Sequence, residues 1–508
     1  MDTSQAIASS AQTTLPRQQS VRHFLVSGAV TSFLAVVVVS GLGFLESILV
    51  ARILGEANFG VLALLLSFWN VASGIAAFGM PLAVAKYLSG EAATSRQATR
   101  QVLRSALLTT FIMSLGVALS SGLLAASVLA SASAPVQSLV LFSFAVPLAL
   151  LLTPALIFAG ALQGLGDISR LNIRLAVAAL FAVAAAVGLS MFFSVGGAFG
   201  AFVIGTTLPG LLCARRVLVR VRQLPEARLN RCITPANLVN FGLPYLLAQL
   251  VVLLALYAVN ATIVSTGGFA ALGSYAVAFA LANVITFIPS ALSIPLIPTL
   301  SSMSVHDPER GRELIPRAMR MVAAVTIPVT GLLIAFSDMA VSFTYGSEYA
   351  NASGPLALLS VSIALLSISG IVGRQLASTG QMWLSLGINA TWSATVVVCA
   401  ILLIPAGGAL GASGAILSGY FVTTVLSFFV GARFLKIDFA RMGPFALWSA
   451  VYLAAFLLLS LSAGVLRMPL VLATTASAVV SSLYLFEPTE RLAIRELFAL
   501  STLRRRAP

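Results

Sequence analysis

Residues 24–50 read FLVSGAVTSFLAVVVVSGLGFLESILV, and Glu46 is the one charged side chain among them. A helix needs about 20 apolar residues to cross the hydrocarbon core of a bilayer. This run is too long for a cleaved signal peptide and for a barrel strand. We therefore expect a retained transmembrane helix, preceded by a disordered cytoplasmic tail over the polar residues 1–23.

Thirteen further apolar runs follow this first one along the chain. They are centred within 60–84, 105–130, 138–160, 171–194, 198–218, 238–264, 272–298, 318–338, 354–374, 383–404, 411–432, 445–465 and 469–486. Only 9% of the residues are charged, against about 25% in soluble domains, so most of the surface must face lipid. The sequence predicts an all-α membrane protein with about 14 transmembrane helices.

The basic residues predict the orientation of these helices. With the N-terminus placed inside, 27 of the 29 lysines and arginines fall in cytoplasmic segments, and the exceptions are Arg52 and Arg467. Cytoplasmic loops collect such residues, and one missed helix would reverse every later loop. We therefore expect a multi-pass protein of the cytoplasmic membrane with both termini inside. The net charge of +14 then needs no nucleic acid to explain it.

The two halves of the chain resemble each other at a nearly constant separation. The matched sets are GGAFGA at 196–201 with GGALGA at 407–412, Gly60 and Asn70 with Gly273 and Asn283, and Leu162 and Gly166 with Leu376 and Gly380. In each set, the two members lie at the same place when the predicted helices of each half are numbered in order. One repeat spans six helices, so the copies share their orientation, and a transport site is expected between them.

The repeat predicts the organisation of the chain. We expect two pseudo-symmetric six-helix lobes and two further C-terminal helices. The expected boundaries are 24–218 for the N-lobe, 219–237 for a cytoplasmic linker, 238–432 for the C-lobe, 433–487 for helices 13 and 14, and 488–508 for a basic tail.

Ionisable groups inside a membrane are costly and are therefore candidates for function. Glu46 lies within the first run and has no ionisable neighbour one turn away. It is interpreted as a residue for proton or cation coupling or for binding sugar, or else as an interfacial carboxylate paired with Arg52. Arg52 is interpreted as a head-group anchor, or as a residue that captures or releases an anionic headgroup outside.

Four further residues are candidates for substrate binding. Lys86 and Arg374 lie near the predicted inner ends of helices 2 and 10. They either flank these helices as ordinary inside charges or attract a diphosphate, which arginine binds bidentately. Asn70 and Asn283 occupy matching repeat positions, where they either hydrogen-bond between helices or bind sugar in a shared cavity.

The sequence lacks the usual patterns of catalysis and of cofactor binding. Cys213, Cys232 and Cys399 follow no paired or metal-ligand spacing. Catalytic triads, paired carboxylates and phosphate-binding glycine loops are missing too, and only two lysines are present to end such a loop. We therefore predict a protein that is not an enzyme and that needs neither a metal nor another cofactor.

Several short motifs, in chain order, resemble a known family. They are ARILG at 51–55 with FG at 59–60, GMP at 79–81 with AKY at 85–87, FGLP at 241–244, Tyr275 with PSA at 289–291, Pro298 and Ser301, and YGSEY at 345–349. This ordered set is similar to the oligosaccharide flippases. They form the polysaccharide-transport branch of the superfamily that includes multidrug and toxin extrusion proteins and lipid II flippases.

The resemblance implies two six-helix lobes around a cavity, alternating access, and a polyprenyl-diphosphate-linked oligosaccharide as cargo. Many relatives carry an aspartate late in helix 7, where this sequence has Asn260. This difference weakens the case for cation coupling through that helix. Expected partners are the lipid-linked glycan, membrane lipids and polysaccharide polymerase machinery. Two alternatives stay open: a cation-coupled exporter of drugs or metabolites, and a membrane glycan polymerase or glycosyltransferase.

Overall fold

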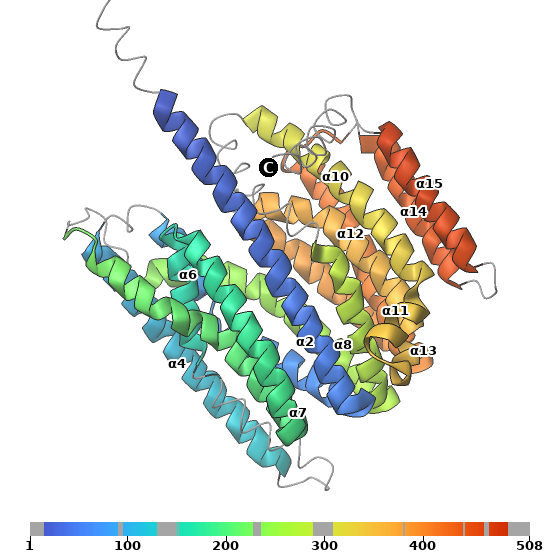
Figure 1. Cartoon of the computed structure of the whole chain (residues 1–508), viewed down its shortest axis with the longest axis horizontal. Coiled ribbons are helices and arrows are strands. Elements are labelled where there is room, and N and C mark those ends of the chain that lie inside the picture. Colours follow the sequence, from blue (N-terminus) through green and yellow to red (C-terminus); the bar gives the residue numbers. More distant parts are fainter. Residues whose placement is uncertain are drawn as a thin grey trace, which may run out of the picture. The chain divides into compact units, whose positions relative to one another are not determined.

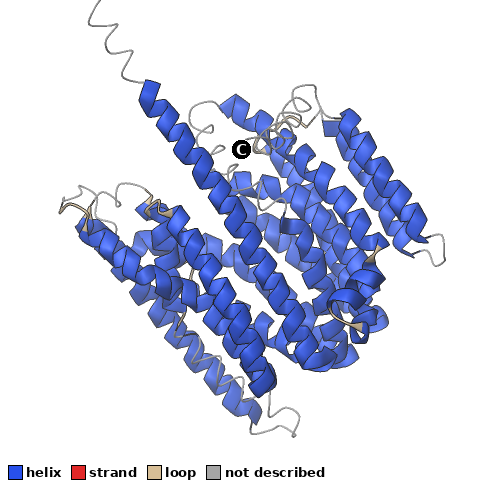
Figure 2. Cartoon of the chain, viewed as in Figure 1, coloured by secondary structure: helices blue, strands red, loops and turns tan. Residues whose placement is uncertain are grey.

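The structure is a computed structural model of the full chain. It describes residues 15–89, 95–129, 150, 152–226, 235–287, 308–378, 381–439, 442–461 and 467–485. Within these ranges every regular element is a helix (Figure 1), and none is a strand (Figure 2). The predicted all-α class is therefore confirmed.

The helices of the first half of the chain are α2 (Leu15–Ala77), α3 (Met80–Leu88), α4 (Arg96–Leu129), η2 (Thr153–Ala155), α6 (Leu156–Gly164) and α7 (Ile168–Arg222). Those of the second half are α8 (Pro235–Asn283), η3 (Val284–Thr286), α10 (Pro308–Ala335), α11 (Ser337–Thr344), η4 (Ser347–Ala352), α12 (Ser353–Ser378) and α13 (Met382–Arg433). Two C-terminal helices follow, α14 (Gly443–Leu461) and α15 (Arg467–Leu485). Helix α2 begins at Leu15, within the segment 1–23 that was expected to be a disordered tail.

The long helices α7 and α13 are helical hairpins. A straight helix of 55 residues, the length of α7, would be about 80 Å long, more than twice the thickness of the hydrocarbon core. A methyl group added to Gly205 would instead lie 2.8 Å from the Cβ of Ala182. In α13 the rings of Trp392 and Tyr420 have centroids 5.3 Å apart. Each helix therefore doubles back on itself.

Seven helical spans in the described ranges are long and apolar enough to cross a membrane, and the shorter apolar helices 443–459 and 468–482 follow them. Four of the seven, in α2, α7, α8 and α13, have 43 to 53 residues, which is enough for two crossings each. They account for all the predicted runs except 138–160, most of which lies outside the described residues. The end of the run 272–298 lies outside them as well.

The backbone repeats the internal correspondence found in the sequence. Gly55 interrupts α2 at φ 72° and ψ 171°, and Gly268, at the equivalent place in the second half, interrupts α8 at φ 75° and ψ −176°. Ser194 interrupts α7 at φ 51° and ψ −131°, and Gly408 interrupts α13 at φ 52° and ψ −128°. This pairing corrects the sequence match of 196–201 with 407–412 by three residues, because the residue that approaches the carbonyl of Leu403 as Gly197 approaches that of Leu189 is Gly411. Two helical hairpins in each half therefore turn through matching conformations, as the internal repeat requires.

The turns before α7 and α13 match as well. The amide of Asp167 donates to the carbonyl of Leu162 at 3.2 Å, and the amide of Gln381 donates to that of Leu376 at 2.9 Å. In each pair the donor follows the acceptor by five residues. The next helix, α7 or α13, begins directly after the donor. The alignment of the repeats is therefore fixed at residue level across this turn.

The chain separates into two compact units, each with its own core. Unit 1 comprises 1–53, 68–250 and 290–296, and unit 2 comprises 54–67, 251–289 and 297–508. In unit 1, α6 packs closely on α3 through Gly160 and Gly164. A methyl group on Gly160 would overlap the carbonyl oxygen of Pro81, and one on Gly164 would lie 2.6 Å from that of Ala85. Small residues let helix backbones approach in this way.

In unit 2 the two C-terminal helices lie beside α10 (Figure 1). Gly331 of α10 leaves room for Phe456 of α14 and for Thr475 of α15. The indole of Trp448 donates to the hydroxyl of Ser481 at 2.8 Å and so ties α14 to α15. This packing places one face of α14 along the apolar pocket that is described in the next subsection.

Candidate transport site

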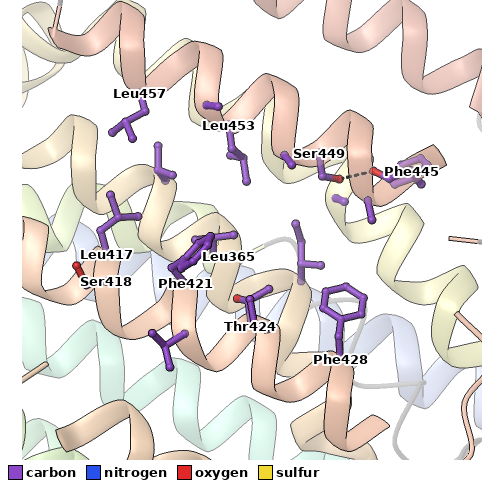
Figure 3. Close-up of a pocket in the computed structure, with 18 of the residues that line it drawn as sticks. Leu365, Leu417, Ser418, Phe421, Thr424, Phe428, Phe445, Ser449, Leu453 and Leu457 are labelled. Carbon is purple, nitrogen blue, oxygen red and sulfur yellow. Dashed lines mark hydrogen bonds between the residues drawn. The ribbon is translucent and has the colours of Figure 1, made fainter. Parts of the chain in front are cut away.

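Unit 2 contains an apolar pocket of about 630 Å³. Its walls come from α12, α13 and α14, with Ala323 of α10 (Figure 3). The labelled residues include Leu365 of α12, Phe421 and Phe428 of α13, and Leu453 and Leu457 of α14. A volume of this size falls within the range of small-molecule sites, about 300–1,000 Å³.

Three hydroxyl groups line this pocket, and each is bonded to its own helix. Ser418 donates to the carbonyl of Gly414, Thr424 to that of Tyr420, and Ser449 to that of Phe445, at 2.7 to 2.9 Å. None of the described residues that line the pocket is charged. The walls therefore suit a hydrocarbon chain and not a hydrated sugar. This pocket could not be predicted from the sequence, because its shape depends on the spacing between α14 and the helices α12 and α13.

Two of the predicted candidates lie on the first arm of α2, in unit 1. Glu46 is half-buried, and no hydrogen bond or ion pair joins it to a residue that the structure describes. Arg52 is exposed and has interactions of its own. Glu46 is therefore a carboxyl group within an apolar span that the described residues leave unpaired.

The other candidates of unit 1 are both exposed. Asn70 lies on the second arm of α2, and Lys86 lies in the last turn of α3. The ammonium of Lys86 is 3.9 Å from the centroid of the Phe241 ring, a cation–π contact to the start of α8. The neighbouring hydroxyl of Tyr87 donates to the carbonyl of Asn237 at 3.2 Å. These contacts tie α3 to the start of α8.

Three candidates are half-buried in unit 2. Asn260 lies in the first arm of α8. Asn283, at the end of that helix, donates its amide to the carbonyl of Phe279 at 2.7 Å, so its donor serves its own helix and not a neighbouring one. Arg374 of α12 has an enclosed Nε atom without a hydrogen-bond partner. None of the described hydrogen bonds joins two of the seven candidates.

The tips of two helical hairpins meet within unit 2. A methyl group on Gly60 would overlap the carbonyl oxygen of Phe269, and one on Gly273 would overlap that of Glu56. Gly60 corresponds to Gly273 in the internal repeat, and Glu56 corresponds to Phe269 in the same alignment. The two contacts are therefore reciprocal, as at a two-fold interface. The hydroxyl of Ser274 also donates to the carboxylate of Glu56. The sequence shows the glycine pair, but it does not predict this contact.

The sequence profile of the polysaccharide biosynthesis proteins matches residues 49–354, more than half of the chain. The chain belongs to this family. No curated protein matches its sequence. The matched residues include both hairpin tips and the start of α12, so the profile covers the reciprocal contact described above.

Solved structures show the same fold. A lipid II flippase, MurJ, in an inward closed conformation has a TM-score of 0.62 at 13% identity, over 93% of this chain and 100% of that one. A MATE transporter in complex with MaL6 has a TM-score of 0.60 at 15% identity, over 85% and 96%. An outward-facing multidrug resistance MATE transporter has a TM-score of 0.55 at 16% identity, again over 85% and 96%.

Proposed function

We propose that this protein is a flippase for cell-surface polysaccharide biosynthesis. It carries a polyprenyl-diphosphate-linked oligosaccharide from the inner to the outer leaflet by alternating access. Membership of the polysaccharide biosynthesis protein family is the observation that carries this proposal. The fold shared with a lipid II flippase supports it. The apolar pocket of unit 2 supports it as well, because a polyprenyl tail needs an apolar surface while its headgroup crosses.

The membrane potential can assist this transport. Moving one charge across the membrane is worth about 2.3 kcal/mol per 100 mV. A diphosphate with two negative charges that moves outward therefore gains about 4 to 5 kcal/mol per 100 mV of inside-negative potential. The protein's task is to shelter the hydrated glycan, and the proposal includes no catalytic step.

The candidate residues divide by the part of the substrate that each suits. Lys86 and Arg374, near the predicted inner ends of their helices, attract the diphosphate. Asn70, Asn260 and Asn283 offer amides to sugar hydroxyls. Glu46 takes part in ion coupling. Arg52 helps to release the anionic headgroup on the outer side.

The same proposal gives the protein its place in the cell. It lies in the cytoplasmic membrane with both termini inside, as the distribution of basic residues predicts. The lipid-linked glycan is made on the inner side and used on the outer side. The natural partners are therefore the substrate, membrane lipids and the polymerase machinery that receives the flipped glycan.

A cation-coupled exporter is the second candidate function. The MATE transporters that share this fold favour it, and so does the half-buried carboxyl of Glu46. An exporter of this kind needs several carboxyl groups within one lobe to exchange a cation for a drug. Glu46 is the one carboxyl group inside a predicted transmembrane run, apart from Asp338 at the outer end of the run 318–338, so we favour the flippase.

Deletion of the gene tests the proposal. We expect the lipid-linked glycan to accumulate in the inner leaflet, out of reach of a glycosidase added from outside, and plasmid-borne wild-type protein should restore access. Resistance to cationic dyes is measured in the same cells. Unchanged sidedness of the glycan together with increased dye sensitivity would replace the flippase by the exporter.

A further inference from the structure

Arg374 of α12 combines partial burial with the lack of a described partner. It lies within an apolar span that extends over 347–376, and it is half-buried with its Nε atom enclosed. Other basic residues near predicted inner helix ends differ from it: Arg100, Arg104 and Arg433 are exposed, and Arg320, although only 3% exposed, has interactions of its own. What sets Arg374 apart is that it is half-buried while no described residue pairs with its charge.

The charge of Arg374 has no counter-charge nearby in the sequence. No aspartate or glutamate occurs between Glu348 and Asp438, a stretch that contains all of α12 and α13. No ion pair or hydrogen bond joins Arg374 to a residue that the structure describes. A half-buried cation that the described residues leave unpaired is costly, so the protein keeps this charge at the expense of stability.

The repeat shows that the fold does not need an arginine here. The residue at the equivalent position of the first repeat is Gly160, and the matched turns that follow both helices fix this alignment. Gly160 lets α6 touch the backbone of α3 at Pro81. An arginine cannot make that contact. At this position the second repeat therefore has a positive charge where the first repeat has close packing between two helices.

The surroundings of the guanidinium leave room for a ligand. Gly370 lies one turn earlier on α12, and a methyl group there would be 3.8 Å from Nη1 of Arg374. Gly373 precedes Arg374, and a methyl group there would meet nothing within 4 Å. The guanidinium therefore lies over Gly370, and the open space at Gly373 leaves room for a headgroup beside the charge.

We propose that Arg374 binds a phosphate group of the anionic lipid that the protein transports. This inference rests on the proposed function and names the residue that recognises the diphosphate. A guanidinium forms two parallel hydrogen bonds with phosphate oxygens. Partial burial strengthens the attraction, because the effective dielectric constant there is lower than in water.

Ligand binding to the purified full-length protein in nanodiscs tests this inference. The probes are undecaprenyl diphosphate, undecaprenol and inorganic diphosphate. The wild-type protein should bind the lipid diphosphate roughly 10- to 100-fold more tightly than the alcohol, as expected for charge-assisted hydrogen bonds. Arg374→Gln should lose this preference, and Arg374→Lys should keep only part of it, because lysine binds as a point charge.

Arg433→Gln is the matched control, since it removes an exposed arginine from the end of α13 and should keep the preference. Thermal unfolding separates binding from structure: Arg374→Gln should be at least as stable as the wild type, because it removes an unpaired charge. Three results would overturn the inference: a full lipid preference in Arg374→Gln, a large loss of stability in that variant, or binding of inorganic diphosphate alone.

The proposed function can fail separately. If Arg374-dependent lipid binding is found while the gene deletion leaves the sidedness of the glycan unchanged, the anionic lipid site stands and the glycan cargo falls. If the deletion traps the glycan while Arg374→Gln binds normally, the flippase stands and this residue assignment falls.

Discussion

Ser194 has a backbone conformation that suits glycine. Its φ of 51° and ψ of −131° nearly equal those of Gly408 at the matching turn. An L-residue with a side chain pays about 1–3 kcal/mol for such a conformation. The hairpin of α7 is therefore held in place by its packing, since Gly205 of one arm meets Ala182 of the other.

Ser194→Gly should raise the stability of the folded protein by about 1 kcal/mol, because it removes this strain. The apparent midpoint of thermal unfolding in detergent measures the change. Gly408→Ser should lower the midpoint for the reverse reason. Ser120→Gly, at an exposed position within α4, serves as the control and should lower it slightly. Equal effects at Ser120 and Ser194 would contradict the argument.

Glu46 provides a second prediction at this scale. A carboxyl group that the described residues leave unpaired can exchange a proton or a cation during transport. In proteoliposomes, Glu46→Gln should make transport independent of an imposed proton or sodium gradient while the lipid substrate still binds. Glu226→Gln, which changes an exposed carboxylate paired with Arg96, is the matched control. Gradient dependence that survives in Glu46→Gln would leave this residue as an interfacial carboxylate.

The positions of the candidate residues along their helices could be predicted from the sequence, whereas their roles stay predictions. The apolar span around Glu46 could be read from composition, and so could the location of Arg374 near a helix end. The pairing of Asn70 with Asn283 predicted similar surroundings, yet Asn70 is exposed and Asn283 is bonded to its own helix. Hydrogen bonds to the preceding turn compete with bonds between helices, and a sequence does not show which of the two wins.

At the scale of elements, the hairpin tips depend on two glycines. Gly60→Ala and Gly273→Ala each place a methyl group on a backbone carbonyl. We expect each to lower the free energy of unfolding by about 1–3 kcal/mol, the usual cost of overpacking. Gly200→Ala, where an added methyl meets nothing within 4 Å, is the control and should be neutral or stabilising.

Combining the two tip substitutions tests the reciprocity of the contact. One shift of the tips relieves both overlaps, so the double variant should lose less stability than the sum of the single losses. Thermal unfolding of all four proteins gives the comparison. Strict additivity would mean that the two glycines sit in independent contacts.

A further element contact joins the turn before α7 to the second arm of that helix. Asp167 pairs with Arg216 at 3.2 Å and with Arg170 at 3.1 Å. The side chain of Arg170 is 51% exposed and that of Arg216 is 24% exposed. Exposed pairs contribute little, so Arg216→Gln should lower stability by about 0.5–1 kcal/mol and Arg170→Gln by less. Thermal unfolding at low and at high salt checks this, because added salt should shrink both effects.

The breaks between helices were partly predictable. The apolar run 171–194 ends at Ser194, where α7 is interrupted. The glycine pair of the repeat follows, and the run 198–218 begins after it. The run 60–84 was expected to form one helix, but Phe78 and Gly79 separate α2 from α3 with φ values of 48° and 66°. Gly79 lies close to the backbone of Gly242, a tertiary contact that the pattern of apolar residues does not encode. The pocket beside α14 escaped prediction for the same reason.

For the whole molecule, the distribution of arginine and lysine makes a prediction about topology. A cysteine-free protein is first made by replacing Cys213, Cys232 and Cys399 with serine. Asn351→Cys, at an exposed site in η4, should react with a membrane-impermeant maleimide in intact cells. Glu226→Cys, in the linker, should react only after the membrane is made permeable.

The physical reason is that transferring positive loops to the outer side is disfavoured, so the chain settles with 27 of its 29 basic residues inside. The helices between residues 226 and 351 supply three crossings, through the two arms of α8 and through α10. An odd number of crossings must place these two sites on opposite sides. Labelling of both from the same side would mean that one of these helices does not cross. Some helices of the second repeat would then run opposite to their counterparts in the first, and a site built from parallel copies would not form.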